Sequence, residues 1–121
     1  MKKILIGDIS DTILDVLEFT FEKRNFAVMT ARNSSGLLSA LEEQDSDMVL
    51  LNTHLEDIEG IELVLKIKEK KPQIPILFMS NSQNFELKLN ARKLGVDGWI
   101  LKPFIAERLV EAIEAHFFSA Y

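Results

Sequence analysis

The sequence predicts a doubly wound α/β fold, (βα)5, in which five parallel strands form one sheet that helices cover on both faces. Short apolar runs alternate five times with longer segments whose apolar residues recur at helical spacing. The apolar runs contain few polar residues, which is typical of strands buried on both faces of a parallel sheet. Strict alternation of strands and helices also implies right-handed crossovers between the strands.

Each predicted strand is a short apolar run that ends at a polar residue or a proline. We expect the strands at residues 4–7, 26–31, 48–52, 76–80 and 99–101. Pro72 and Pro75 bracket the turn that leads into the fourth strand. Pro103 ends the fifth strand, because proline has no N–H to donate to a neighbouring strand.

Each predicted helix carries its apolar residues on one face. The first helix begins at Ser10 or Asp11, whose side chains can cap it, and runs to about Arg24. The second begins at Ser34 or Ser35, the third at Gly60, the fourth spans residues 84–94 and the last begins near Ala106. Gly95 follows the fourth helix at the C′ position, where glycine commonly ends a helix. The inner faces carry Ile13, Leu14, Leu17 and Phe21, then Leu37, Leu38 and Leu41, then Ile61, Leu63, Val64 and Ile67, and finally Leu109, Val110, Ile113 and Phe117.

Length and composition predict one domain over residues 1–121. An apolar fraction of 47% and a charged fraction of 27% are ordinary for a globular chain. The net charge of −5 disfavours direct binding to nucleic acid or to an anionic membrane. The sequence has no cysteine, which excludes disulfides and thiol catalysis and is compatible with the cytoplasm. The apolar run after Met1 is too short for a signal peptide, and no stretch approaches membrane-spanning length.

Four polar residues follow four of the predicted strands at the point where each strand ends. They are Asp8, Asn52, Ser80 and Lys102. Because the carboxyl ends of parallel strands meet at one edge of the sheet, these side chains are expected to converge on one crevice. Asn52 is the most informative of them. A carboxylate at that place could attack a phosphoryl donor, whereas an amide oxygen carries no full charge and cannot.

Four segments of the chain together resemble the receiver domain of bacterial response regulators. They are residues 3–8 (KILIGD), 47–52 (DMVLLN), 74–80 (IPILFMS) and 98–104 (GWILKPF), and the resemblance covers essentially the whole chain. It implies a signalling domain on the (βα)5 fold. In that family an aspartate takes a phosphoryl group from the phosphohistidine of a kinase, assisted by Mg²⁺. The resemblance also implies a cis peptide bond between Lys102 and Pro103.

Mapped onto the family, the predicted site lacks the groups that its chemistry needs. Receivers carry two adjacent acids after the first strand, and here these positions are Asp8 and Ile9. The phosphoacceptor position is Asn52, and the next metal ligand would be the backbone carbonyl of His54. Ser80 and Lys102 match the residues that hold the phosphoryl oxygens. We therefore expect no catalytic residue, no metal, no cofactor and no enzymatic activity.

Simple structural roles are expected for the residues around this site. Asp8 should pair with Lys102, Asn52 should hydrogen-bond to Ser80 or Lys102, and Ile9 should fill the place of the metal. The side chain of His54 should be solvated, and His116 should lie favourably near the end of the last helix. The charged run of Glu56, Asp57 and Glu59 is expected to be a solvated loop.

Three functions remain open from the sequence. The first is a degenerate pseudo-receiver that works as a protein-interaction module without phosphorylation. The second is a conventional phosphorelay receiver with residual switching. The third is a flavodoxin-like cofactor domain of the same topology, which would need a glycine-rich phosphate loop after the first strand.

Partner binding is expected on the face made by the fourth helix, the fifth strand and the last helix, where receivers dimerise or bind partners. The candidate residues are Phe85, Lys88, Arg92 and Trp99. Lys88 and Arg92 are four residues apart, so they project from one side of the helix. The partner is a second copy of the chain or another protein. In the alternative interpretation, Phe85 belongs to the core and the two cations are merely solvated. Trp99 is interpreted equally as a switch residue or as surface packing.

Overall fold

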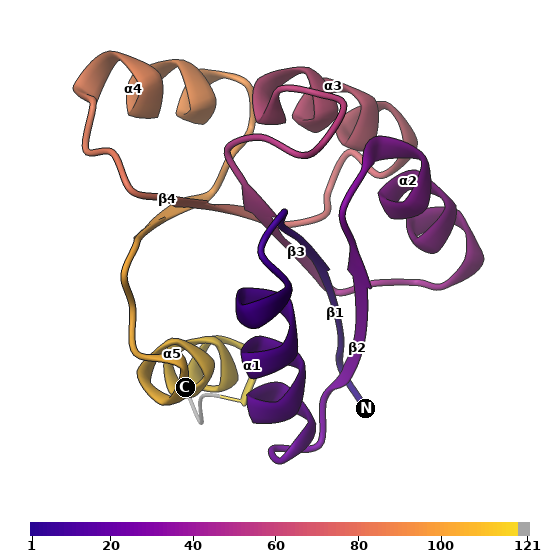
Figure 1. Ribbon diagram of the computed structural model, residues 1–121. Coiled ribbons are helices and arrows are strands. Elements are labelled where there is room, and N and C mark those ends of the chain that lie inside the picture. Colours follow the sequence, from indigo (N-terminus) through magenta and orange to yellow (C-terminus); the bar gives the residue numbers. More distant parts are fainter. Residues whose placement is uncertain (119–121) are drawn as a thin grey trace.

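The predicted α/β fold is confirmed. The structure is a computed structural model that describes residues 1–118. The strands are β1 (Lys3–Gly7), β2 (Ala27–Ala31), β3 (Met48–Asn52), β4 (Ile76–Ser80) and β5 (Gly98–Leu101). They pair in parallel in the order β2-β1-β3-β4-β5, which is the flavodoxin-like arrangement (Figure 1). The order reverses direction between β1 and β3, so the crevice at their carboxyl ends is a natural place for a site.

Helices cover both faces of the sheet, as Figure 1 shows. Helices α1 (Asp11–Glu22) and α5 (Ala106–Phe118) lie together on one face. Helices α2 (Ser34–Glu43), α3 (Gly60–Lys70) and α4 (Phe85–Lys93) lie on the other. Alternate strand residues therefore enter different cores: Leu5 and Val49 pack with α2 and α3, whereas Ile6 and Leu50 pack with α1 and α5. Burying each such side chain stabilises the fold by about 1.5–3 kcal/mol.

Local side chains begin and end the helices. Ser10 caps α1 and Asn84 caps α4, each accepting a hydrogen bond from a backbone N–H three residues later. Helix α1 ends two residues earlier than predicted, because the chain turns through Asn25, whose φ of 65° lies in the left-handed region. Gly95, with φ at 105°, follows α4 as predicted.

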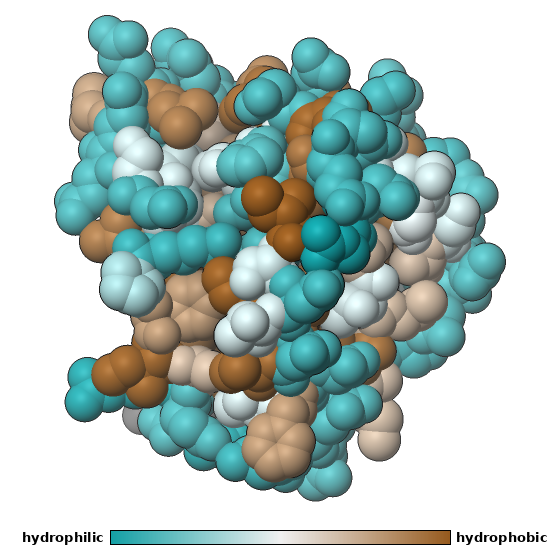
Figure 2. All heavy atoms as spheres, in the orientation of Figure 1, coloured by the Kyte–Doolittle hydropathy of each residue, from teal (hydrophilic) through white to brown (hydrophobic). Residues whose placement is uncertain are grey.

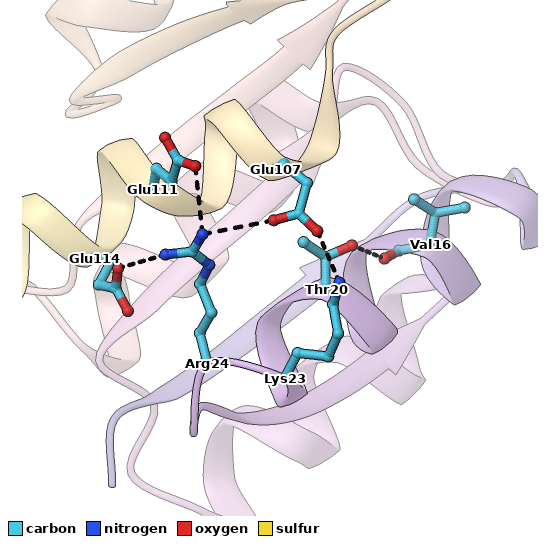
Figure 3. A network of polar contacts seen from close by, with 7 residues as sticks. All are labelled: Val16, Thr20, Lys23, Arg24, Glu107, Glu111 and Glu114. Carbon is cyan, nitrogen blue, oxygen red and sulfur yellow. Dashed lines mark hydrogen bonds and ion pairs between the residues drawn. The ribbon is translucent and has the colours of Figure 1, made fainter.

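Charged residues hold α5 against α1 along one side of the sheet (Figure 3). Arg24 contacts Glu114 at 2.7 Å, Glu111 at 3.3 Å and Glu107 at 3.6 Å, and Lys23 contacts Glu107 at 2.8 Å. The hydrogen bond to Glu114 is the main cause that raises the pKa of Arg24, and Lys23 lowers the pKa of Glu107. These contacts join the C-terminal end of α1 to α5, from Glu107 in its first turn to Glu114.

Within residues 1–118, the helices are too short or too polar for any of them to cross a membrane.

Candidate functional site

The carboxyl ends of the strands form a crevice that gathers the predicted polar residues. Asp8, Asn52 and Ser80 are 0%, 4% and 3% exposed, and the side chain of Lys102 is 14% exposed. Parallel pairing places Asn52 beside Met79 and Ser80 beside Leu101, so residues that are distant in sequence meet at one edge. Asp8, Asn52 and Lys102 meet at this edge as predicted, and Ser80 lies at the end of the neighbouring strand β4.

Lys102 is the centre of the crevice. Its ammonium group donates to Oδ2 of Asp8 at 2.8 Å and to Oδ1 of Asn52 at 2.9 Å. The pairing of Asp8 with Lys102 is therefore confirmed, and of the two partners predicted for Asn52 the structure has Lys102. The Lys102–Pro103 bond is cis, as expected. A buried carboxylate needs such a charge partner, because desolvation penalises an isolated ion strongly.

The side-chain amide of Asn52 is bonded at both of its ends. While Oδ1 accepts from Lys102, Nδ2 donates to the backbone carbonyl of His54 at 2.9 Å. An ionised carboxylate could not make both bonds, because it has no hydrogen to donate to a carbonyl. The side chain of His54 is exposed, as expected.

Ser80 bonds to its own loop rather than to Asn52. Its Oγ accepts from the backbone N–H of Ser82 at 3.0 Å. The carbonyl of Ser82 in turn accepts from the indole N–H of Trp99 at 3.1 Å. The ring of Trp99 packs edge-on against Phe78, with 5.8 Å between the ring centroids. A short series of bonds therefore leads from the crevice towards α4.

The residues present do not fit Mg²⁺, which needs hard oxygen ligands in near-octahedral geometry. The two oxygens of Asp8 already accept from Lys102 and from the backbone N–H of Ser10, the latter at 2.9 Å. The neighbouring position carries the apolar Ile9, and the carbonyl of His54 is bonded to Asn52. In the described part of the chain, no three His, Cys, Asp or Glu residues form a group that could hold a metal ion.

The charged run after β3 is exposed to solvent, as expected, but two of its residues are also bonded to neighbouring segments. Glu56 and Asp57 are exposed but bonded: Arg32 contacts Glu56, and Ser34 contacts Asp57. The side-chain and backbone hydrogen bonds from Ser34 lower the pKa of Asp57. Arg32 was not among the predicted site residues. Its role depends on two loops meeting in space, and no local sequence signal marks such a meeting.

The candidate partner residues lie around one hollow beside α4. Phe85 is 75% exposed, so its alternative assignment to the core is wrong. The ammonium of Lys88 lies 5.8 Å from the centroid of the Trp99 ring. Figure 2 shows apolar surface exposed among hydrophilic groups over α4. The hollow measures about 450 Å³ and is lined by Phe85, Lys88, Leu89, Arg92, Val96, Asp97, Gly98 and Trp99.

The fold and its strand-end crevice fit a receiver-like α/β domain, and comparison with known sequences identifies the family. The profile of the response regulator receiver domain matches residues 4–114. The chain belongs to this family and is the receiver domain of a two-component response regulator.

Particular relatives agree with this assignment. The chain is 35% identical over 114 residues to the nisin biosynthesis regulatory protein NisR of Lactococcus lactis subsp. lactis, covering 94% of this chain and 49% of NisR. It is 27% identical to the alkaline phosphatase synthesis transcriptional regulatory protein PhoP of Bacillus subtilis, with 94% and 48% covered. The chain thus spans about half the length of these curated relatives.

Solved structures show the same fold. A two-component response regulator from Clostridium difficile superposes with a TM-score of 0.91 at 26% identity, covering 97% of this chain and 96% of that one. A receiver domain protein from Methanospirillum hungatei superposes with a TM-score of 0.88 at 27% identity, covering 96% and 93%.

Proposed function

We propose that this receiver domain is a pseudo-receiver, which signals by binding a protein in one fixed state rather than by being phosphorylated at residue 52. The observation that carries the proposal is the amide of Asn52, which is buried and bonded to Lys102 and to the carbonyl of His54. An amide offers no nucleophilic oxygen at the phosphoacceptor position, and the carbonyl of His54 that a metal would use is already bonded to it.

A conventional phosphorelay receiver is the second candidate, and one observation favours it. Ser80 and Lys102 still stand where the family places the residues that hold a phosphoryl group. Membership of the receiver family disfavours a flavodoxin-like cofactor domain.

Acetyl phosphate with Mg²⁺ should leave the protein unmodified. Intact mass spectrometry after incubation is expected to show the mass of the untreated chain, because residue 52 has no carboxylate to form an acyl phosphate. Mg²⁺ and beryllofluoride should likewise leave the melting temperature unchanged, because the site does not bind them. A ligand that did bind, at 100 times its Kd, would add about 2.7 kcal/mol to the free energy of unfolding. An adduct with the mass of one phosphoryl group would support the conventional receiver instead.

The partner-binding part of the proposal rests on the hollow beside α4. Its apolar lining offers anchors that a partner can bury, and the exposed cations Lys88 and Arg92 favour an acidic contact. The bond from Trp99 to the carbonyl of Ser82 favours one arrangement of this surface. Binding to a protein partner, or to a second copy of the chain, would then be constitutive and independent of a kinase.

Charge reversal on α4 should abolish binding without unfolding the domain. The variant Lys88→Glu with Arg92→Glu is expected to lose self-association in sedimentation, or the capture of its partner, and Trp99→Ala should weaken either one. Lys66→Glu, which reverses an exposed charge on α3, is the matched control and should bind normally. If every variant binds like the parent, this surface is not the interface and α1 becomes the next candidate.

A further inference from the structure

We propose that Arg32, in the loop between β2 and α2, and Ser34, the first residue of α2, form a clasp that holds the β3–α3 loop in place beside the crevice. In the clasp, Arg32 contacts the carboxylates of Asp11 and Glu56, and Ser34 contacts the carboxylate of Asp57. It goes beyond the proposed function, because it concerns what orders the loop rather than whether residue 52 is phosphorylated.

Arg32 joins three segments that border the crevice. Its guanidinium contacts Oδ1 of Asp11 in the first turn of α1. It also contacts Oε2 of Glu56 in the β3–α3 loop, at 3.2 Å from both Nε and Nη2. The planar guanidinium presents several N–H groups in fixed directions, so one side chain can bind two carboxylates at once. These contacts raise the pKa of Arg32, with the hydrogen bond to Asp11 as the largest cause.

The two loops are joined by backbone bonds as well as by side chains. The carbonyl of Arg32 accepts from the backbone N–H of Glu56 at 3.0 Å, so this pair of residues is connected twice. Two residues further along, the N–H of Ser34 donates to Oδ1 of Asp57 at 2.9 Å, and the hydroxyl of Ser34 also contacts that carboxylate. Asp57 therefore places a negative charge at the first turn of α2, where the helix dipole favours it.

The loop that the clasp holds also carries the carbonyl used by Asn52. Residues 53–59 connect β3 to α3, and within them the carbonyl of His54 accepts from Asn52. At the end of the loop Gly60 packs so closely that a Cβ there would lie 2.7 Å from the carbonyl oxygen of Thr53. The loop is thus bonded at its start, in its middle and at its end by groups of the chain itself.

The expected effect of the clasp is local rather than global. Arg32, Asp11 and Glu56 are exposed or half-buried, and exposed ion pairs contribute little to the free energy of unfolding. Loops, however, open with much smaller free energies than whole domains, so a few contacts can control how often a loop opens. Because salt screens exposed charges, added salt should make this opening more frequent.

Hydrogen exchange measured by mass spectrometry on the whole chain tests the clasp. In Arg32→Ala, the amides of residues 54–58 should exchange about tenfold faster, while the buried strands keep their protection. Arg32→Lys should restore part of the protection, since one ammonium group replaces a forked guanidinium. The parent should show salt-dependent exchange at these residues, and Arg32→Ala should lose most of that dependence.

Arg24→Ala is the matched control, because Arg24 also binds several carboxylates but does so between α1 and α5. It should speed exchange near that contact and leave residues 54–58 unchanged. Glu56→Gln provides a second, milder test, since it removes one charge of the clasp and retains the shape. The proposal is contradicted if residues 54–58 stay protected in Arg32→Ala, or if hydrogen exchange in this variant becomes faster by the same factor over the whole chain.

Discussion

Replacing Lys102 with methionine should lower the free energy of unfolding by about 3–5 kcal/mol, which is the usual cost of removing one partner from a buried ion pair. Methionine fills a similar volume, but Asp8 is fully buried and would lose the charge that lies 2.8 Å from it. Asn52 would lose the donor to its Oδ1 at the same time. Urea unfolding followed by circular dichroism measures the loss.

A double-mutant cycle separates the ion pair from the packing of the lysine stem. Adding Asp8→Asn to Lys102→Met removes the unpaired charge, so the double variant should recover part of the lost stability. Lys66→Met, on the exposed side of α3, should change stability by no more than about 0.5 kcal/mol. A loss in Lys102→Met as small as that of Lys66→Met would show that the pair does not stabilise the crevice.

Restoring phosphorylation should require two substitutions, Ile9→Asp together with Asn52→Asp. The carboxylate of residue 52 would then attack the phosphorus of acetyl phosphate, forming an acyl phosphate and releasing acetate. Asn52→Asp alone places a carboxylate oxygen about where Nδ2 lies, 2.9 Å from the carbonyl oxygen of His54. Two acceptors face each other there, and a cation must lie between them. Ile9→Asp supplies a second ligand for that cation.

Two measurements distinguish the double variant from the single one. Intact mass after incubation with acetyl phosphate and Mg²⁺ should show the phosphoryl adduct only in the double variant. Without Mg²⁺ the double variant should melt at a lower temperature than the parent, because three carboxylates then share one crevice. Mg²⁺ should raise its melting temperature but not that of the parent. Ready phosphorylation of Asn52→Asp alone would contradict this account of the metal site.

The strands and the crevice were predictable because they depend on local patterns with a strong physical cause. The apolar runs ending at Asn52 and Ser80 gave the observed bounds of β3 and β4, since burial on both faces leaves little freedom in register. Once the sheet is parallel, the meeting of Asp8, Asn52 and Lys102 follows from topology alone. The pairing of Asp8 with Lys102 then follows from the cost of burying a lone charge.

The parts that were missed depend on contacts between loops or on the exact course of a turn. Arg32 and Glu56 are 24 residues apart, and nothing local in either segment specifies that they meet. Helix α1 ends earlier than predicted because the chain turns through Asn25 in a left-handed conformation, and no residue near Asn25 in the sequence indicates this turn. The sequence left the core alternative for Phe85 open, because a phenylalanine in the first turn of a helix fits a core or a surface equally well, and only the structure shows that it is exposed.

The position of Trp99 gives this domain an optical reporter of its own. The sequence contains one tryptophan, so fluorescence excited at the red edge of aromatic absorption comes from this residue. Its indole is bonded to the carbonyl of Ser82, packed on Phe78 and approached by the ammonium of Lys88. Because emission from indole depends on polarity and nearby charge, rearrangement of the loop after β4 or coverage of α4 would change its colour and intensity. The state of this surface can therefore be followed in solution without attaching a dye.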